Sequence, residues 1–202
     1  MSFSQRVARY FPALVLSLGV LISSAAYGVT ITFGPVVGAN ETPYLGHVED
    51  TFTVAPTSGD WRNAQVYGNP TPDIFGGPIG SPLAAAIDVT ENVTGLFTFH
   101  SVDLSGNNST QVTYNFEGYR NNALVLSQGG VLNQSIFWFT IPSNNPALIL
   151  DRLNIGLNPL GGATSFNLDN IVVRQAIPEP ATLSLLAMGA FAAVAYRRRR
   201  AA

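Results

Sequence analysis

The chain has 202 residues and a formal net charge of -2, which is enough for one ordinary domain with short appendages. Charged residues are 11% of the chain and hydrophobic residues 47%, which excludes a disordered acidic protein and argues against a basic face for nucleic acid. With no cysteine, disulfides, cysteine zinc sites and thiol nucleophiles are excluded as well.

The first 28 residues have the order of a secretory signal peptide. Two arginines precede an apolar run over residues 13–22, and small residues follow it. We predict a signal peptide over residues 1–28, cut after Ala26 or Gly28, and export through the Sec translocon. The alternative is an uncleaved anchor, although the run is shorter than the roughly 17 to 25 residues of a membrane-spanning helix.

The middle of the chain, residues 29–177, is predicted to be one all-β domain. Short apolar or alternating runs recur between turn residues, and helical periodicity is nearly absent. The runs predict about nine strands, at residues 29–33, 51–54, 87–90, 96–104, 112–116, 123–126, 136–141, 148–157 and 166–174. Without helices between them, neighbouring strands should pair antiparallel in a β-sandwich or jelly roll, with a barrel as the alternative.

The strand at 96–104 carries one of the two histidines of the chain. Its apolar register shifts by one residue at His100 and Ser101, which predicts a β-bulge. Neither His100 nor His47 lies in a Gly-x-Ser-x-Gly or His-Glu-x-x-His pattern, so we expect no catalytic residues and no enzyme. A secreted hydrolase is an alternative, which requires two of the eleven carboxylates in the domain to converge in a cleft.

Residues 59–82 are predicted to be a long irregular connection rich in proline and glycine, yet they contain large rings. Flat rings exposed on a loop stack on sugar faces, so Trp61, Tyr67 and Phe75 are the candidate ligand surface of a carbohydrate-binding module. The alternative is that these rings fold back and close one end of the sandwich. Trp138 is a further candidate ring, because the alternation places it opposite its phenylalanine neighbours.

The run of residues 181–196 contains no charge and ends at four arginines, Arg197, Arg198, Arg199 and Arg200. At a rise of about 1.5 Å per residue such a helix spans roughly 24 Å, which is short for a bilayer unless the arginine side chains snorkel. We predict a transmembrane helix that holds the arginines at the cytoplasmic surface, with the domain outside the inner membrane.

Pro178, Glu179 and Pro180 stand directly before this run, where the prolines predict an extended, exposed joint. The motif, the apolar helix and the terminal arginines together resemble the PEP-CTERM sorting signal of Gram-negative bacteria. For residues 178–202, the resemblance implies recognition by an exosortase, a membrane-embedded cysteine transpeptidase that would cut near the motif and release or transfer the domain. Many such proteins are surface or matrix components of organisms that make exopolysaccharide. A permanently anchored periplasmic domain is the alternative.

Three segments of the domain, 68–75, 97–104 and 165–171, are similar to phrases in PEP-CTERM proteins of unassigned role. The last of them resembles the final strand of carbohydrate-binding-like jelly rolls, which place a structural ion there. This resemblance makes Asp169 a candidate calcium ligand, with Asn170 beside it and oxygen atoms from Glu49 and Asp50. The alternative is that Asp169 or Asn170 bonds to backbone amides. No other cofactor is expected.

These features lead to one hypothesis: an exported β-sandwich that a PEP-CTERM system sorts to the cell envelope or the extracellular matrix. There it is expected to act structurally or in association with exopolysaccharide, without binding nucleic acid, and to touch the membrane only until its C-terminal helix is removed. The edges of the predicted sheets leave lateral association open.

Overall fold

The computed structural model describes residues 28–76, 84–106, 111–133, 136–160 and 165–176, together with Gly189. Apart from Gly28 and Gly189, the predicted signal peptide and the predicted C-terminal helix lie outside these residues. Among the residues that are described, no helix is long and apolar enough to cross a membrane. Residues Ala26–Ala176 form a compact unit by themselves.

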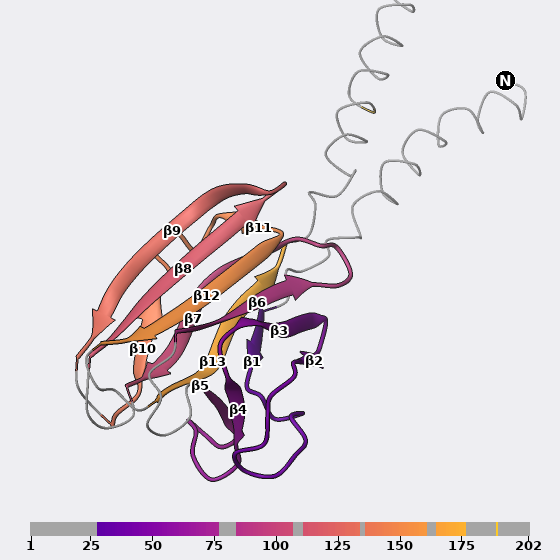
Figure 1. Cartoon of the computed structure of the whole chain (residues 1–202). Coiled ribbons are helices and arrows are strands. Elements are labelled where there is room, and N and C mark those ends of the chain that lie inside the picture. Colours follow the sequence, from indigo (N-terminus) through magenta and orange to yellow (C-terminus); the bar gives the residue numbers. More distant parts are fainter. Residues whose placement is uncertain are drawn as a thin grey trace, which may run out of the picture. The chain divides into compact units, whose positions relative to one another are not determined.

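Thirteen strands make up the described part of this unit, and they confirm the predicted all-β antiparallel sandwich (Figure 1). They are β1 (Gly28–Ile31), β2 (His47–Glu49), β3 (Phe52–Ser58), β4 (Trp61–Ala64), β5 (Asp73–Gly76), β6 (Ala85–Glu91), β7 (Phe97–Ser105), β8 (Val112–Arg120), β9 (Ala123–Leu132), β10 (Phe139–Pro142), β11 (Ile149–Leu150), β12 (Arg152–Pro159) and β13 (Phe166–Gln175).

The strands form two sheets. Sheet A has seven strands in the order β10-β7-β13-β5-β4, with β1 also paired to β13 and β11 to β7. Sheet B has six strands in the order β2-β3-β6-β12-β8-β9, which Figure 1 shows side by side with β9 at the outer edge. The chain changes sheets at Asp151, so the predicted strand 148–157 is two strands, β11 in sheet A and β12 in sheet B.

The core lies between the two sheets and follows from alternation in the sequence. Along β6 and β12, every second residue is buried, as expected for strands with one face on a core. Two edge-to-face ring pairs join the sheets: Phe52 packs on Phe97 with centroids 5.6 Å apart, and Phe99 packs on Phe116 at 5.3 Å.

The predicted β-bulge in β7 is confirmed. Ser101 pairs with Val172 and Phe99 with Val173, so the register passes over His100. Because of this extra residue, both halves of β7 bury their apolar side chains, including Phe97, Phe99, Val102 and Leu104.

Two further predictions about the strands were wrong. Residues 59–82 are not an irregular connection throughout, because β4 and β5 lie within them and pair with each other. Their four-residue segments are buried on both faces, so the sequence shows no alternation there. The predicted strand 136–141 begins only at Phe139, and Phe137 before it is 71% exposed.

Substitution of a ring between the sheets tests this packing. Phe116→Ala should lower the free energy of unfolding by about 3–5 kcal/mol, because it removes a fully buried ring and leaves a cavity between β8 and β7. Phe137→Ala, the matched control at an exposed ring, should change it by no more than about 0.5 kcal/mol. Urea unfolding of both variants measures the difference, and equal losses would contradict the assignment of the core.

Candidate functional site

Two of the three rings predicted to form a ligand surface are buried, so that surface does not exist as predicted. Trp61 is 2% exposed and Phe75 is 9% exposed. Trp61 packs edge-to-face on Phe166, with centroids 5.5 Å apart, and its indole N–H donates to the Ala86 carbonyl at 3.1 Å. Trp61 turns into the core between the sheets, as the alternative of rings folded back expected, because β4 and β5 extend sheet A. Phe75 follows the core residue Ile74 and therefore lies on the other face of β5, where Asp73 also stands.

The third ring, Tyr67, is half-buried and lies beside Trp138. The two rings stack with centroids 5.7 Å apart and an interplanar angle of 25°. The Tyr67 hydroxyl donates to the Ile136 carbonyl at 2.7 Å, and Phe137 next to it is exposed. We call Tyr67, Phe137 and Trp138 the aromatic ledge; it joins two segments that are far apart in the sequence.

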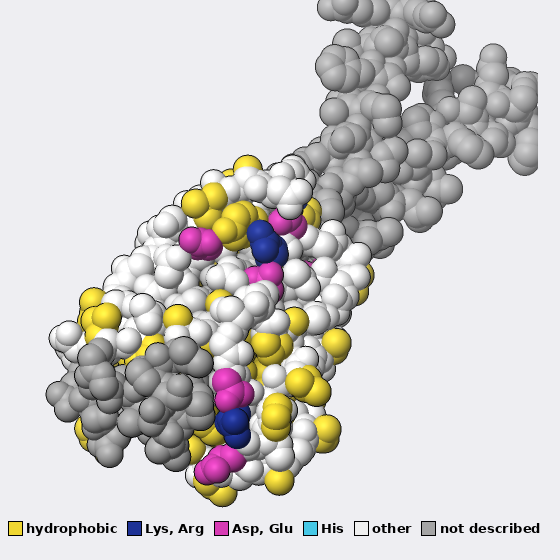
Figure 2. Space-filling view, in the orientation of Figure 1, with side chains coloured by type: hydrophobic (Ala, Val, Ile, Leu, Met, Phe, Trp, Pro, Cys, Tyr) yellow, Lys and Arg dark blue, Asp and Glu magenta, His cyan; other side chains and the backbone are white. Residues whose placement is uncertain are grey.

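A second candidate surface is the outer face of sheet B, where polar side chains from three adjacent strands stand side by side. Glu117 on β8 pairs with Asn154 on β12, and Asn154 pairs in turn with Asp88 on β6. In the view of Figure 2, charged side chains are few and stand in small groups, with hydrophobic side chains and white surface between them. We call the set Asp88, Asn115, Glu117, Tyr119, Arg152 and Asn154 the polar face.

Hydrogen bonds within the polar face hold its side chains in place. The Asn154 amide donates to Asp88 at 2.7 Å, and the Tyr119 hydroxyl donates to Glu117 at 2.6 Å. The guanidinium of Arg152 lies 4.1 Å from the centre of the Tyr119 ring and bonds to Asp88 at 3.3 Å. The hydrogen bond to Glu117 raises the pKa of Tyr119, so this hydroxyl stays protonated and remains a donor at neutral pH.

Next to the polar face, the sheet surface is hollowed. Gly156 pairs with Ala86 on one side, so two neighbouring small residues form the floor, and with Asn115 on the other side, whose longer side chain borders it. The hollow has a volume of about 310 Å³ and is lined by Ser58, Ala86, Thr113, Asn115, Gly156 and Asn158, among others. Amide groups therefore border a shallow cavity on an otherwise regular sheet.

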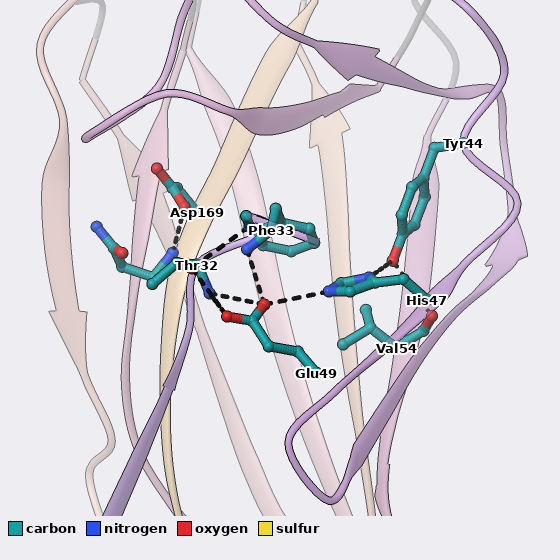
Figure 3. A network of polar contacts seen from close by, with 9 residues as sticks. Thr32, Phe33, Tyr44, His47, Glu49, Val54 and Asp169 are labelled. Carbon is teal, nitrogen blue, oxygen red and sulfur yellow. Dashed lines mark hydrogen bonds and ion pairs between the residues drawn. The ribbon is translucent and has the colours of Figure 1, made fainter. Parts of the chain in front are cut away.

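His47, which lies in neither of the catalytic patterns sought in the sequence, belongs to a polar network at the start of sheet B (Figure 3). Glu49 accepts hydrogen bonds from the backbone N–H of Thr32 and Phe33, from the Thr32 hydroxyl and from Nε2 of His47. Because a carboxylate only accepts, Nε2 carries the proton, and Nδ1 accepts the Tyr44 hydroxyl at 2.7 Å.

This network joins chain segments rather than presenting a reactive group. Both nitrogens of His47 are occupied, and the Thr32 hydroxyl donates to Glu49 instead of facing a base. Burial lowers the pKa of His47, although Glu49 partly offsets the effect, so the ring is neutral at pH 7. The second histidine, His100, bonds to the Thr98 hydroxyl at 3.0 Å. The His47-x-Glu49 spacing places both side chains on one face of a strand, a signal that the sequence analysis missed.

Three aspartates stand in a row on the outer side of sheet A, at the level of the predicted calcium ligand. Asp169 on β13 pairs directly with Asp103 on β7. On β5, Ile74 pairs with Leu168 of β13, so the preceding residue, Asp73, stands beside Asp169. Asp169 therefore has Asp103 on one side and Asp73 on the other. Adjacent strands are about 4.8 Å apart, and all three carboxyl groups are buried.

The segment around Asn69 covers this row. The backbone N–H of Asn69 donates to Asp169 at 2.7 Å, and its side-chain amide donates to Asp103 at 3.1 Å. The side-chain amide of Asn170 donates both to Asp103 and to the Asn69 carbonyl. Asp169 also accepts the backbone N–H of Asn170, so it bonds to backbone amides as the alternative to calcium expected.

Asp73 is the exception in the row, because neither of its carboxyl oxygens has a hydrogen-bond partner although the residue is fully buried. Burial and the neighbouring Asp169 raise the pKa of Asp73 to about 9. Burial also raises the pKa of Asp169 to about 7, against the opposing effect of its backbone hydrogen bonds. Asp73 is therefore protonated at neutral pH unless a cation compensates its charge.

The unpartnered carboxyl group of Asp73 bears on whether the residues present could hold the predicted calcium ion. Glu49 does not suit this ion, because donors surround its carboxylate. Asp73 does suit it, since a hard cation prefers carboxylate oxygens and would supply the positive charge that this buried carboxylate lacks, whereas both oxygens of Asp169 already accept backbone N–H groups. No group of three or more His, Asp or Glu side chains in the described part of the chain is placed to hold a metal.

The predicted sorting residues, Pro178, Glu179, Pro180, Arg197, Arg198, Arg199 and Arg200, lie outside the described residues. A family model nevertheless matches this end of the chain: residues 176–200 match the PEP-CTERM protein-sorting motif. The predicted sorting signal is thereby confirmed. The motif implies an exported protein that an exosortase processes.

Solved structures with a similar fold are distant from this chain. A DUF4465 family protein from Bacteroides caccae is 8% identical with a TM-score of 0.48, covering 74% of this chain and 100% of that one. A family 29 carbohydrate-binding module from Piromyces equi is 10% identical with a TM-score of 0.44, covering 75% and 92%. A cleaved adhesin domain of Lys-gingipain from Porphyromonas gingivalis is 11% identical with a TM-score of 0.41, covering 75% and 99%. No curated protein matches the chain.

The buried Asp73 should make the domain less stable in alkaline than in acidic solution. Its pKa is about 9 in the folded state and near 3.8 when exposed, so the folded state binds more protons between these values. The stabilisation is complete below the lower value and is lost as the pH rises towards the higher one. Without divalent cations, the unfolding midpoint should fall by at least about 3 °C between pH 5 and pH 8.5, and Asp73→Asn should flatten this dependence.

Asp50→Asn is the control, because Asp50 is an exposed carboxylate, and it should leave the wild-type pH dependence intact. The same thermal scans at pH 8.5 with added calcium test the ion. We expect calcium to raise the midpoint of the wild type and not that of Asp73→Asn. A midpoint that rises equally in both variants would contradict a calcium ion at Asp73, and a flat wild-type profile would contradict the buried carboxyl group itself.

Proposed function

We propose that this chain is a non-enzymatic surface or extracellular-matrix protein that associates with exopolysaccharide through the polar face of sheet B. The observation that carries the proposal is the hollow of about 310 Å³ bordered by amide side chains on that face. Export and exosortase processing, which the sorting motif implies, deliver the domain to the compartment where such a polymer is found.

The chemistry of the polar face suits a polymer of sugar rings. Sugar hydroxyls both donate and accept, and the amides of Asn115 and Asn158 offer both kinds of group at the hollow. Tyr119 on β8 adds a ring against which a sugar packs. Arg152, directly opposite it on the adjacent strand β12, holds that ring in place. The hollow lies at the small end of the range of about 300–1,000 Å³ found for ligand sites.

The charged side chains of the polar face indicate whether a charged or an uncharged polymer would bind there. Arg152 is paired with Asp88, and Glu117 is held by Asn115 and Tyr119, so no unopposed positive charge faces the ligand. An acidic polymer would meet two carboxylates with one guanidinium between them. The face therefore favours an uncharged polysaccharide.

No catalytic role is part of the proposal. The buried aspartates lie beneath the Asn69 segment rather than in a cleft, and His47 is held on both nitrogens. The polar groups that are accessible on sheet B are hydrogen-bonded to one another, which suits recognition of a bound chain rather than proton transfer to it.

Binding of purified exopolysaccharide from the host's own culture tests the proposal. Affinity electrophoresis of the wild-type domain, residues 26–176, should show retardation that increases with polymer concentration. Tyr119→Ala should weaken the apparent affinity by about tenfold, because it removes both the ring and the platform for Arg152.

Tyr67→Ala is the matched control, since it removes a tyrosine from the aromatic ledge on the other sheet. It should bind as the wild type does. Loss of binding in Tyr67→Ala with full binding in Tyr119→Ala would move the ligand to the aromatic ledge. Absence of any retardation of the wild type would contradict association with the polymer altogether.

A further inference from the structure

Strand β9 differs from every other strand that ends a described sheet. It is ten residues long and pairs with β8 on one side only. The other described strands that pair on one side only, β1, β2, β4, β10 and β11, are two to four residues long. Of these, β2 contains Glu49, β4 contains Arg62, and β10 ends at Pro142. Short length, charge and proline are the usual means by which proteins prevent edge pairing, and each of these three strands has at least one of them.

Strand β9 has none of the three. Its sequence, Ala-Leu-Val-Leu-Ser-Gln-Gly-Gly-Val-Leu, contains no charged residue and no proline. Val125 forms a bulge against β8, because Leu126 pairs with Gly118 and Leu124 with Tyr119. From Leu126 to Leu132 the register with β8 is continuous. Seven residues of regular, uncharged strand therefore end sheet B, with half of their backbone hydrogen-bonding groups directed away from β8.

We propose that β9 is an interface that pairs antiparallel with β9 of a second copy of this chain, joining two B sheets into one continuous sheet. The geometry of the regular segment selects a register. Opposite residues of an antiparallel pair share a face, and a pairing centred on Gly129 uses all seven residues. It places Ser127 opposite Val131 on the outer face, twice by symmetry, and Leu126 opposite Leu132 on the inner face.

The side chains in this register favour the self-pairing. Val131 is 51% exposed and would be covered by the second copy, while Leu126 and Leu132 are already buried on the inner side. Gly129 stands opposite its own copy, where the absence of a side chain allows close approach. The Gln128 side chain is held inward by the Pro142 carbonyl and the Asn144 amide, so it does not obstruct the edge. In a self-paired strand, charged residues can be brought opposite charges of the same sign. Because β9 has no charged residue, this repulsion does not arise.

The pairing has a consequence for the ligand surface. Glu117 and Asn115 of the polar face lie on β8, the immediate neighbour of β9. A sheet continued through two β9 strands therefore brings two polar faces onto one surface, related by a two-fold axis. Two weak sites on one polymer raise the overall avidity without any new contact. The self-pairing itself does not depend on the proposed polysaccharide.

Sedimentation equilibrium of the domain, residues 26–176, tests the interface without any polysaccharide. The wild type should form a dimer whose dissociation constant changes little between low and high salt, because no charges take part. Ser127→Lys with Val131→Lys places lysine opposite lysine twice and should raise the dissociation constant by about tenfold or more. Ser127→Glu with Val131→Lys places opposite charges together in the same register and should restore the dimer, now with a dependence on salt.

Val48→Lys, an exposed valine on the short edge strand β2, is the control and should remain dimeric. Gly129→Lys is a second disrupting variant if the double substitution unfolds the domain, because an added Cβ at Gly129 meets no atom closer than 3.4 Å. A wild type that stays monomeric at high micromolar concentration overturns the proposal. A dimer that survives both lysine variants in folded protein overturns it as well, and rescue by the Glu–Lys pair identifies the register.

Discussion

The packing of phenylalanine rings between the two sheets is the interaction on which the rest of this structure depends. Across the core, Phe97 of β7 packs on Phe52 of β3, and Phe99 of β7 packs on Phe116 of β8. One strand of sheet A therefore contacts both halves of sheet B. Burial of such rings is the largest favourable contribution available to a chain without disulfides. Because β7 also pairs with β13, β10 and β11, its position determines where the outer faces of sheet A lie.

The outer faces of the two sheets differ in whether another segment of the chain covers them. The outer side of sheet A at β5, β13 and β7 is covered by the Asn69 segment, which the aspartate row holds through two hydrogen bonds. Sheet B keeps its outer face, where alternate residues of β8, β12 and β6 are polar and partly exposed. The buried row thus stabilises a covering segment on sheet A, while the polar face of sheet B stays partly exposed.

The sequence was informative wherever local periodicity determines the structure. Alternation predicted the long strands, and the one-residue shift at His100 predicted the bulge, because both follow from side chains in one strand meeting one core. Trp61 and Phe75 were misplaced because strands buried on both faces carry no alternation. Asp73 and Asp169 meet only through the pairing of β5 with β13, and no pattern within either segment reveals a contact between residues so far apart.

The polar face illustrates an intermediate case. Asn115, Glu117 and Tyr119 occupy every second position of β8, so the sequence alone places them on one face of a strand. Their neighbours Asn154 and Asp88 come from β12 and β6, and only the register brings them together. The C-terminal motif is the opposite case, because a membrane protease recognises a short linear segment and the order of residues there suffices.

Intact mass and localisation of the protein in its own host test the central claim, that this domain is exported and sorted by its C-terminal motif. The wild type should be found outside the cell with a mass that lacks the residues after Pro178-Glu179-Pro180. Replacement of these three residues by alanine should leave the protein in the membrane with Arg197 to Arg200 intact. A wild-type protein that keeps its terminal arginines and remains at the inner membrane would contradict the claim.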